Sequence, residues 1–300
     1  MGVLATVGVL AVSGCSSSGD GSGATPVGGD PCPVDPLRVV VSVDQWGDVV
    51  EQLGGRCTEV TTIIQGGDVD PHDFEPTPAD SVAFDKADLV VVNGLDYDHW
   101  ALDAADAASS DPAVVDAGEV VGLEEGANPH LWYGPQYVQQ VSAAVTEELK
   151  ALAPDAAAYF DARAAAWQQD LAAYLAEVEA LRATAAGRPY AATEAVFADM
   201  AEALGLVDRT PRGYATSAAN ESEPSPGDIH AFEELLRAGD VDVLVFNTQT
   251  EGSVPDQLRS VAERAGVPIV EVTESVPAGH PSFVAWQLEQ LRALAAALSG

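Results

Sequence analysis

Basic residues are scarce in this sequence: 13 Lys and Arg stand against 47 Asp and Glu among 300 residues, a formal net charge of −34. A chain this acidic is repelled by the phosphate backbone of nucleic acids, and no local basic patch is visible, so we exclude nucleic-acid binding. The same negative field would attract a cation. A solvated acidic surface is the simpler interpretation of the charge.

Long apolar runs are also lacking. After the first dozen residues, no apolar run reaches the roughly 18 residues that a membrane-spanning helix requires. Apolar residues still make up 47% of the chain, which is enough to bury a core and excludes disorder over most of the length. A chain of this size forms two domains or one large one.

The N-terminal residues indicate export. An apolar stretch at 3–12 is too short to cross a bilayer and ends in Val-Ser-Gly-Cys at Cys15. This order resembles the lipobox of bacterial lipoproteins, whose cysteine is lipidated and becomes the mature N-terminus, so we assign 1–15 to a signal segment. The Gly- and Ser-rich residues that follow predict a flexible tether over 16–36. No Lys or Arg precedes the apolar run, which leaves open a start codon upstream. The alternative interpretation of the apolar run is a buried strand near the N-terminus.

Two further cysteines, Cys32 and Cys57, remain. Their spacing matches no zinc-ribbon pair, and neither has a second cysteine nearby. Because an exported protein enters an oxidising compartment, we expect a disulfide between them. It would fix the start of the first strand to the approach of the second.

Strand-like and helix-like segments alternate in both halves of the chain, which predicts parallel sheets covered by helices and therefore two α/β lobes, at 37–134 and 187–300. The expected strands are 37–43, 58–64, 89–93, 113–115, 189–193, 241–246 and 268–272. The expected helices are 46–53, 78–86, 99–108, 196–204, 228–238, 254–265 and 281–298. No sequence repeat, phosphate loop or dinucleotide fingerprint is present.

The strongest periodicity lies in a helical region, 135–186, between the lobes. Apolar side chains recur there at alternating spacings of four and three residues: Phe160, Ala164, Trp167, Leu171, Tyr174, Val178 and Leu181. This pattern predicts one amphipathic helix over about 154–184, roughly 46 Å long. About three heptads are marginal for a coiled-coil dimer, so we expect a monomer in which the helix packs across both lobes and limits their movement.

Candidate metal ligands follow the strands. His72 lies in the acidic loop 67–76 after the second strand, and His130 lies in Asn-Pro-His-Leu-Trp before the next helix. Glu194 and Glu274 end the first and last strands of the second lobe. Open α/β sheets bind ligands at the carboxyl ends of their strands, so lobes that face each other would bring these four side chains into one cleft. Two imidazoles and two carboxylates are sufficient to bind a divalent transition metal.

The order of these motifs resembles a known family. Asp-Pro-His in an acidic loop, Asn-Pro-His-Leu-Trp, a long linker helix and Thr-Glu-Ala-x-Phe are similar to the metal-binding solute receptors of ABC transporters, more narrowly the manganese/zinc-type cluster with a rigid helical linker. The match runs from 37 to the C-terminus. The resemblance implies that His72, His130, Glu194 and Glu274 bind the metal. It also implies an extracytoplasmic receptor, anchored in the membrane by lipid and partnered with an ABC permease.

Three features of the motifs indicate which metal is bound. Glu194 stands where zinc receptors usually have a third histidine and manganese receptors a glutamate. Glu274 stands where the family usually has aspartate, and it adds one methylene. The His-rich loop common in zinc receptors is replaced by the acidic segment 118–128. Carboxylate oxygens are hard ligands, and two glutamates allow a coordination number of five or six, so we expect Mn²⁺ as the bound metal. Zn²⁺ is the expected competitor, because the Irving–Williams order gives it the higher intrinsic affinity.

Two other functions would use the same residues. A metal-dependent hydrolase needs an open coordination position and a base, and the sequence has no His-Glu-x-x-His helix and no Gly-x-Ser-x-Gly elbow. A surface adhesin explains the tether but not the converging ligands. We therefore expect a binding protein and not an enzyme. For His99, His230 and His280 we expect structural roles.

Overall fold

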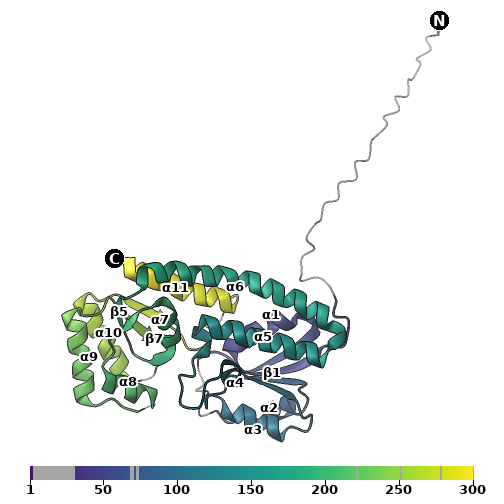
Figure 1. Ribbon diagram of the computed structural model, residues 1–300, viewed down its shortest axis with the longest axis horizontal. Coiled ribbons are helices and arrows are strands. Elements are labelled where there is room, and N and C mark those ends of the chain that lie inside the picture. Colours follow the sequence, from purple (N-terminus) through teal and green to yellow (C-terminus); the bar gives the residue numbers. More distant parts are fainter. Residues whose placement is uncertain are drawn as a thin grey trace.

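The computed structural model describes residues 1–2, 31–67, 71, 74–220, 222–250, 252–277 and 279–299. Two four-stranded sheets, each covered by helices, lie towards opposite ends of the molecule, and one long helix runs along both (Figure 1). This arrangement confirms the predicted fold class of two α/β lobes joined by a linker helix. Cys15, the proposed tether up to residue 30, and His72 lie outside the described residues.

The first sheet has the strand order β2–β1–β3–β4, and every pair is parallel. Its strands are β1 (Leu37–Val43), β2 (Thr58–Ile64), β3 (Leu89–Val92) and β4 (Ala113–Asp116). All four side chains of β3 are buried, as are those of β1 from Val39 onward. A strand with helices on both faces needs apolar residues in succession, which explains the unbroken valine runs.

The helices of this lobe begin at α1 (Asp44–Gly54), directly after β1, and end with the long α5 (Pro135–Leu152). Between them lie the shorter elements η1 (Gly55–Cys57), α2 (Pro78–Phe84), α3 (His99–Ala107), α4 (Ala117–Val121) and η2 (Leu131–Tyr133). Thr77 caps α2 by accepting a hydrogen bond from the Asp80 amide, and the Asp80 carboxylate accepts one from the Thr77 amide. A disulfide joins Cys32 to Cys57, just before β2.

The second sheet is also parallel, with the order β6–β5–β7–β8. Its strands are β5 (Pro189–Ala192), β6 (Val207–Asp208), β7 (Val243–Asn247) and β8 (Ile269–Val272). Its helices are η4 (Ala195–Phe197), α7 (Ala198–Leu204), α8 (Arg212–Ala219), α9 (Pro226–Ala238), α10 (Ser253–Ala265) and α11 (Phe283–Ser299). The sequence did not predict β6, because two residues are too few to show an alternating pattern.

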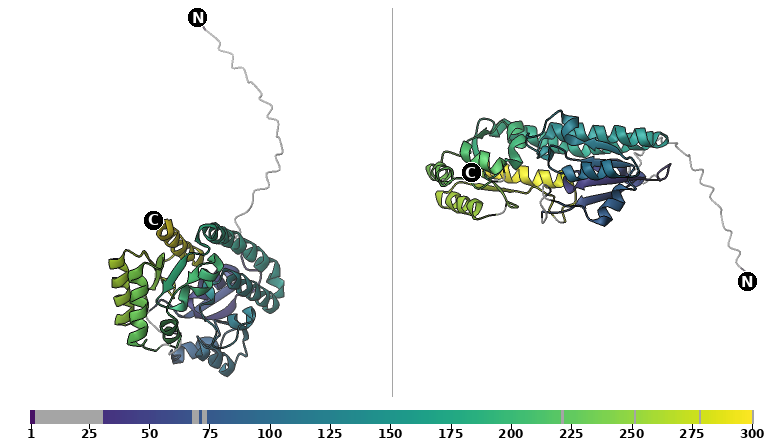
Figure 2. Two further views of the ribbon diagram at one scale, coloured as in Figure 1. Left: turned by 60° about the vertical axis from the view of Figure 1, so that its left-hand side comes forward. Right: turned by 90° about the horizontal axis from the view of Figure 1, so that it is seen from below.

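The linker is a short turn, η3 (Pro154–Ala156), followed by the 29-residue helix α6 (Ala157–Ala185). It packs against α1 and α5 of the first lobe and against α7 and α11 of the second, as predicted for a helix shared by both lobes (Figures 1 and 2). The predicted apolar stripe is the buried face, from Phe160 to Leu181. Trp167 in this stripe also donates a hydrogen bond to the Ser142 hydroxyl of α5, at 2.9 Å.

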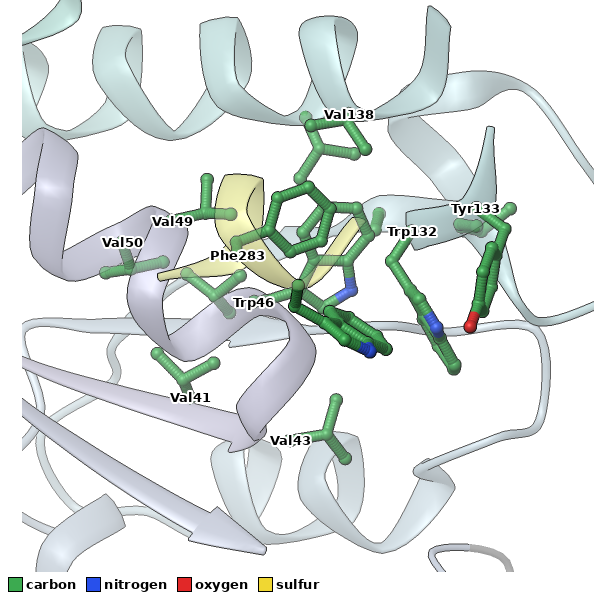
Figure 3. Close-up of a cluster of buried hydrophobic side chains, with 14 of the residues drawn as sticks. Val41, Val43, Trp46, Val49, Val50, Trp132, Tyr133, Val138 and Phe283 are labelled. Carbon is green, nitrogen blue, oxygen red and sulfur yellow. The ribbon is translucent and has the colours of Figure 1, made fainter. Parts of the chain in front are cut away.

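One buried apolar cluster extends from the first sheet through α5, α6 and α11 to strands β7 and β8. Phe283 of α11 lies in it among side chains of α1 and α5, including Val49 and Val138 (Figure 3). Trp132, from η2, is buried in the same cluster. Because the two lobes share this core, the carboxyl ends of their strands are held in a fixed relation to each other.

Candidate metal centre

Three of the four predicted ligands, His130, Glu194 and Glu274, lie in the described part of the chain. His72 does not, but Pro71 and Phe74 do. The Pro71 carbonyl accepts a hydrogen bond from the Trp100 indole at 3.0 Å, and the Phe74 ring packs against Trp100 with centroids 4.6 Å apart.

His130 and Glu274 meet across the boundary between the lobes. His130 precedes η2 in the first lobe, whereas Glu274 follows β8 in the second. The His130 Nε2 atom lies 3.5 Å from Glu274 Oε1, and the two side chains are only 13% and 23% exposed. Tyr97 donates a hydrogen bond from its hydroxyl to the same Oε1 atom, at 2.7 Å. Burial, with the charge of Glu274, raises the pKa of Tyr97 well above its usual value, so this phenol stays a donor.

The loop that carries His130 is held by buried hydrogen bonds. Asn93, just past β3, donates from its amide to the Pro129 carbonyl at 2.9 Å and accepts from the Trp46 indole at 3.0 Å. The imidazole of His130 lies against Trp132, with ring centroids 5.3 Å apart. The His130 ring therefore packs against an aromatic side chain at the carboxyl end of the first sheet.

The backbone around Glu274 is held from both lobes. The side-chain oxygen of Gln249 accepts hydrogen bonds from the amides of Glu274 and Ser275, at 2.5 and 2.8 Å. From the first lobe, the buried Gln45 amide donates to the Glu274 carbonyl at 3.1 Å. These hydrogen bonds hold the backbone of Glu274 and Ser275, the second and third residues after β8.

Glu194 makes a separate set of bonds. Its Oε2 atom accepts hydrogen bonds from the Thr250 hydroxyl, at 2.6 Å, and from the Asn247 amide. The side chain lines a cavity of about 60 Å³ with Tyr190 and Tyr214 in the second lobe. Among the described residues, no three His, Cys, Asp or Glu side chains lie close enough together to hold a metal ion. The structure thus brings His130 and Glu274 together, while Glu194 bonds to donors of its own lobe.

Asn128 and Asp199 are polar neighbours of His130. Asn128 Oδ1 lies 2.6 Å from His130 Nδ1, and its amide lies 3.4 Å from Asp199 Oδ2 of α7. Burial raises the pKa of Asp199 to about 6; His130 opposes this shift and Glu202 adds to it. Neither residue was predicted from the sequence, although Asn128 belongs to the Asn-Pro-His motif, which was a usable signal. Nothing in the sequence pattern distinguishes Asp199.

Two of the other histidines have carboxylate partners away from His130. His99 Nδ1 lies 3.8 Å from Asp96 at the surface, and His280 Nε2 lies 3.5 Å from Glu289. His280 also lines a cavity of about 610 Å³ formed by β8, α10 and α11, and none of the three predicted ligands that the structure describes lines that cavity.

The model of the zinc-uptake complex component A family, described as periplasmic, matches residues 39–297. The chain belongs to this family. It is 35% identical over 140 residues to the manganese-binding lipoprotein MntA of Halalkalibacterium halodurans, a match that spans 45% of this chain and 46% of that protein. It is 24% identical to the high-affinity zinc uptake system protein ZnuA of Bacillus subtilis, over 84% of this chain and 81% of that protein. These matches confirm the family that the motifs resemble.

Solved structures show the same fold at lower identity. The periplasmic zinc-binding protein TroA of Treponema pallidum superposes with a TM-score of 0.73 at 22% identity, over 88% of this chain and 99% of that one. The protein FpvC of Pseudomonas aeruginosa, solved in complex with Mn²⁺, gives a TM-score of 0.74 at 20% identity, over the same shares of the two chains.

Proposed function

We propose that the protein captures a divalent transition metal between its two lobes and delivers it to an ABC importer. The observation that carries this proposal is the pair of His130 Nε2 and Glu274 Oε1, which come from opposite lobes and lie 3.5 Å apart. A neutral imidazole nitrogen and a carboxylate oxygen both carry lone pairs, so a cation between them would turn repulsion into attraction. Membership of a zinc-uptake family supports this function.

The full ligand set that we propose is His72, His130, Glu194 and Glu274. Both hydrogen bonds to the Glu194 carboxylate end on Oε2, and a carboxylate can still offer its second oxygen to a metal. Thr250 and Asn247 would then orient that carboxylate from behind, as outer partners of metal ligands commonly do. Nitrogen and oxygen donors together suit Mn²⁺ and Zn²⁺.

Mn²⁺ is our proposed cargo, with Zn²⁺ as competitor. Two carboxylates supply hard oxygen donors and permit more than four bonds, whereas Zn²⁺ prefers a tetrahedral site. The names of relatives support both metals, since one is the manganese ABC transporter substrate-binding lipoprotein PsaA of Streptococcus pneumoniae and another is the zinc protein of Bacillus subtilis.

We further propose that lipid on Cys15 anchors a monomeric, non-enzymatic receptor outside the cytoplasm, where an ABC permease accepts the metal. The names of the manganese relatives, which are lipoproteins, support the anchor. Within the part of the chain that the structure describes, no helix is long and apolar enough to cross a bilayer.

Metal analysis of protein purified without chelators, followed by titration with Mn²⁺ and Zn²⁺, tests the function. We expect one metal ion per chain, and we expect His130→Ala to lose most of the binding because an inner ligand is removed. His230→Ala is the matched control, since His230 lies in α9, far along the chain from the proposed ligands. Equal binding by the two variants would contradict the proposed centre.

A further inference from the structure

The side chain of Asn128 makes bonds in both lobes. Its Oδ1 atom lies 2.6 Å from His130 Nδ1 and accepts a hydrogen bond from the His130 backbone amide at 3.3 Å. Its Nδ2 atom donates to the Ala195 carbonyl at 3.1 Å and to Asp199 Oδ2 at 3.4 Å. Ala195 immediately follows Glu194, so one amide group connects the His130 ring with the loop of a proposed ligand from the other lobe.

These partners fix which way the Asn128 amide faces. Turning it over would point its NH₂ group at the His130 backbone N–H and its oxygen at two other oxygens. The bonds to the Ala195 carbonyl, to Asp199 and from the His130 amide would then all be lost. The oxygen therefore faces the His130 ring and can only accept. His130 Nδ1 must then carry the proton of the neutral imidazole, which leaves the lone pair on Nε2, the atom that faces Glu274.

We infer that Asn128 is a positioning residue that sets the tautomer of His130 for metal binding and ties its ring to the loop of Glu194. This inference rests on the proposed function and deepens it. A metal-binding histidine usually donates its other ring N–H to an outer acceptor, and loss of that acceptor lowers metal affinity roughly 10- to 100-fold. Asn128 also links the two lobes, because its Nδ2 atom donates hydrogen bonds to Ala195 and Asp199 of the opposite lobe.

Two substitutions separate the effect of Asn128 on the His130 tautomer from its hydrogen bonds to the opposite lobe. Asn128→Ala removes the acceptor for His130 Nδ1 and the donor to Ala195 together. Asn128→Asp keeps an acceptor for the ring, but it loses the donor and places a carboxylate beside Asp199. Asn220→Ala is the matched control, since Asn220 is exposed and its side-chain amide donates to the Thr216 carbonyl at the end of the same helix, in the second lobe.

Nitrogen-15 NMR of the histidine rings in the metal-free full chain reads the tautomer, with the His130 signals assigned by their loss in His130→Ala. We expect His130 to be protonated on Nδ1 in the parent and in Asn128→Asp, and to shift towards Nε2 protonation in Asn128→Ala. Titration with Mn²⁺ should show Asn128→Ala binding roughly 10- to 100-fold more weakly than the parent, because the acceptor for the ring is lost. Asn128→Asp should also bind more weakly than the parent, because the donor to the Ala195 carbonyl is lost. Asn220→Ala should match the parent in both measurements.

A parent His130 protonated on Nε2 would overturn the inference, and so would an Asn128→Ala variant with unchanged tautomer and affinity. If Asn128→Ala does not fold, as judged by circular dichroism, Asn128→Asp decides: weaker Mn²⁺ binding with the Nδ1 proton retained supports the inference, and unchanged affinity overturns it. If the parent binds no metal, the proposed function fails, whereas the tautomer in the metal-free parent and its variants still tests the role of Asn128.

Discussion

Replacement of Phe283 by alanine should show whether the two lobes unfold as one unit. Phe283 is fully buried and begins α11 of the second lobe, yet its backbone amide donates to Asp48 of α1 in the first lobe at 2.8 Å. Its ring packs against Trp167 of the linker helix, with centroids 6.3 Å apart. Removing the ring leaves a cavity where α1, α6 and α11 meet. Phe→Ala changes in cores lower the free energy of unfolding by about 3–5 kcal/mol.

Urea unfolding of the metal-free protein, followed by both fluorescence and circular dichroism, measures this loss. We expect one transition for the parent and one for Phe283→Ala, displaced to lower urea, because the buried cluster includes both lobes. Val82→Ala is the control: Val82 is 49% exposed, and its loss should change the free energy of unfolding by less than about 0.5 kcal/mol. Two separate transitions, or a loss below about 1 kcal/mol in Phe283→Ala, would refute the shared core.

Four further changes have defined outcomes. Cys15→Ala should release the protein from the membrane fraction, and retention in high salt would argue against a lipid anchor. Replacing Cys32 and Cys57 by alanine opens a covalent loop with a sequence separation of 25, which should lower the free energy of unfolding by about 3 kcal/mol in urea; two free thiols in exported parent protein would exclude the bond. Glu194→His should raise the affinity for Zn²⁺ relative to Mn²⁺ in competition titrations, and an unchanged ratio would remove Glu194 from the site. Burial raises the folded-state pKa of Asp199 to about 6, above its ordinary value, so the folded state binds the proton more tightly than the unfolded state. The melting temperature of the parent should therefore fall relative to that of Asp199→Asn as the pH rises from about 4 to 7, and a constant difference between the two would contradict this shift.

Most of the fold could be predicted from local patterns in the sequence. The observed strands β1 and β2 have the predicted bounds, because each is a long β-branched run between polar residues. The linker helix was predicted from its stripe, which is its buried face. Strand β6 was missed because two residues show no alternation, and α8 was missed because it buries a single side chain, Tyr214, and so has no apolar stripe.

The candidate site was predictable only at the level of strand ends. The rule that ligands lie at the carboxyl ends of parallel strands selects His130 and Glu274, and the structure places them together. The bonds that Gln249 makes to the Glu274 backbone arise from loop geometry after β7, which no sequence pattern encodes. For the same reason, the sequence does not reveal that Glu194 bonds to Thr250 and Asn247.

The position of α11 determines the order in which the protein can be completed. The first lobe is synthesised first, but α11, the last helix of the structure, contacts α1 and α6. The carboxylate of Asp48 cannot accept its hydrogen bond from the Phe283 amide until Phe283, 235 residues later in the chain, has been synthesised. A partly synthesised chain therefore exposes part of its core, and this part becomes protected from proteases once residues 283–299 have been added and have packed.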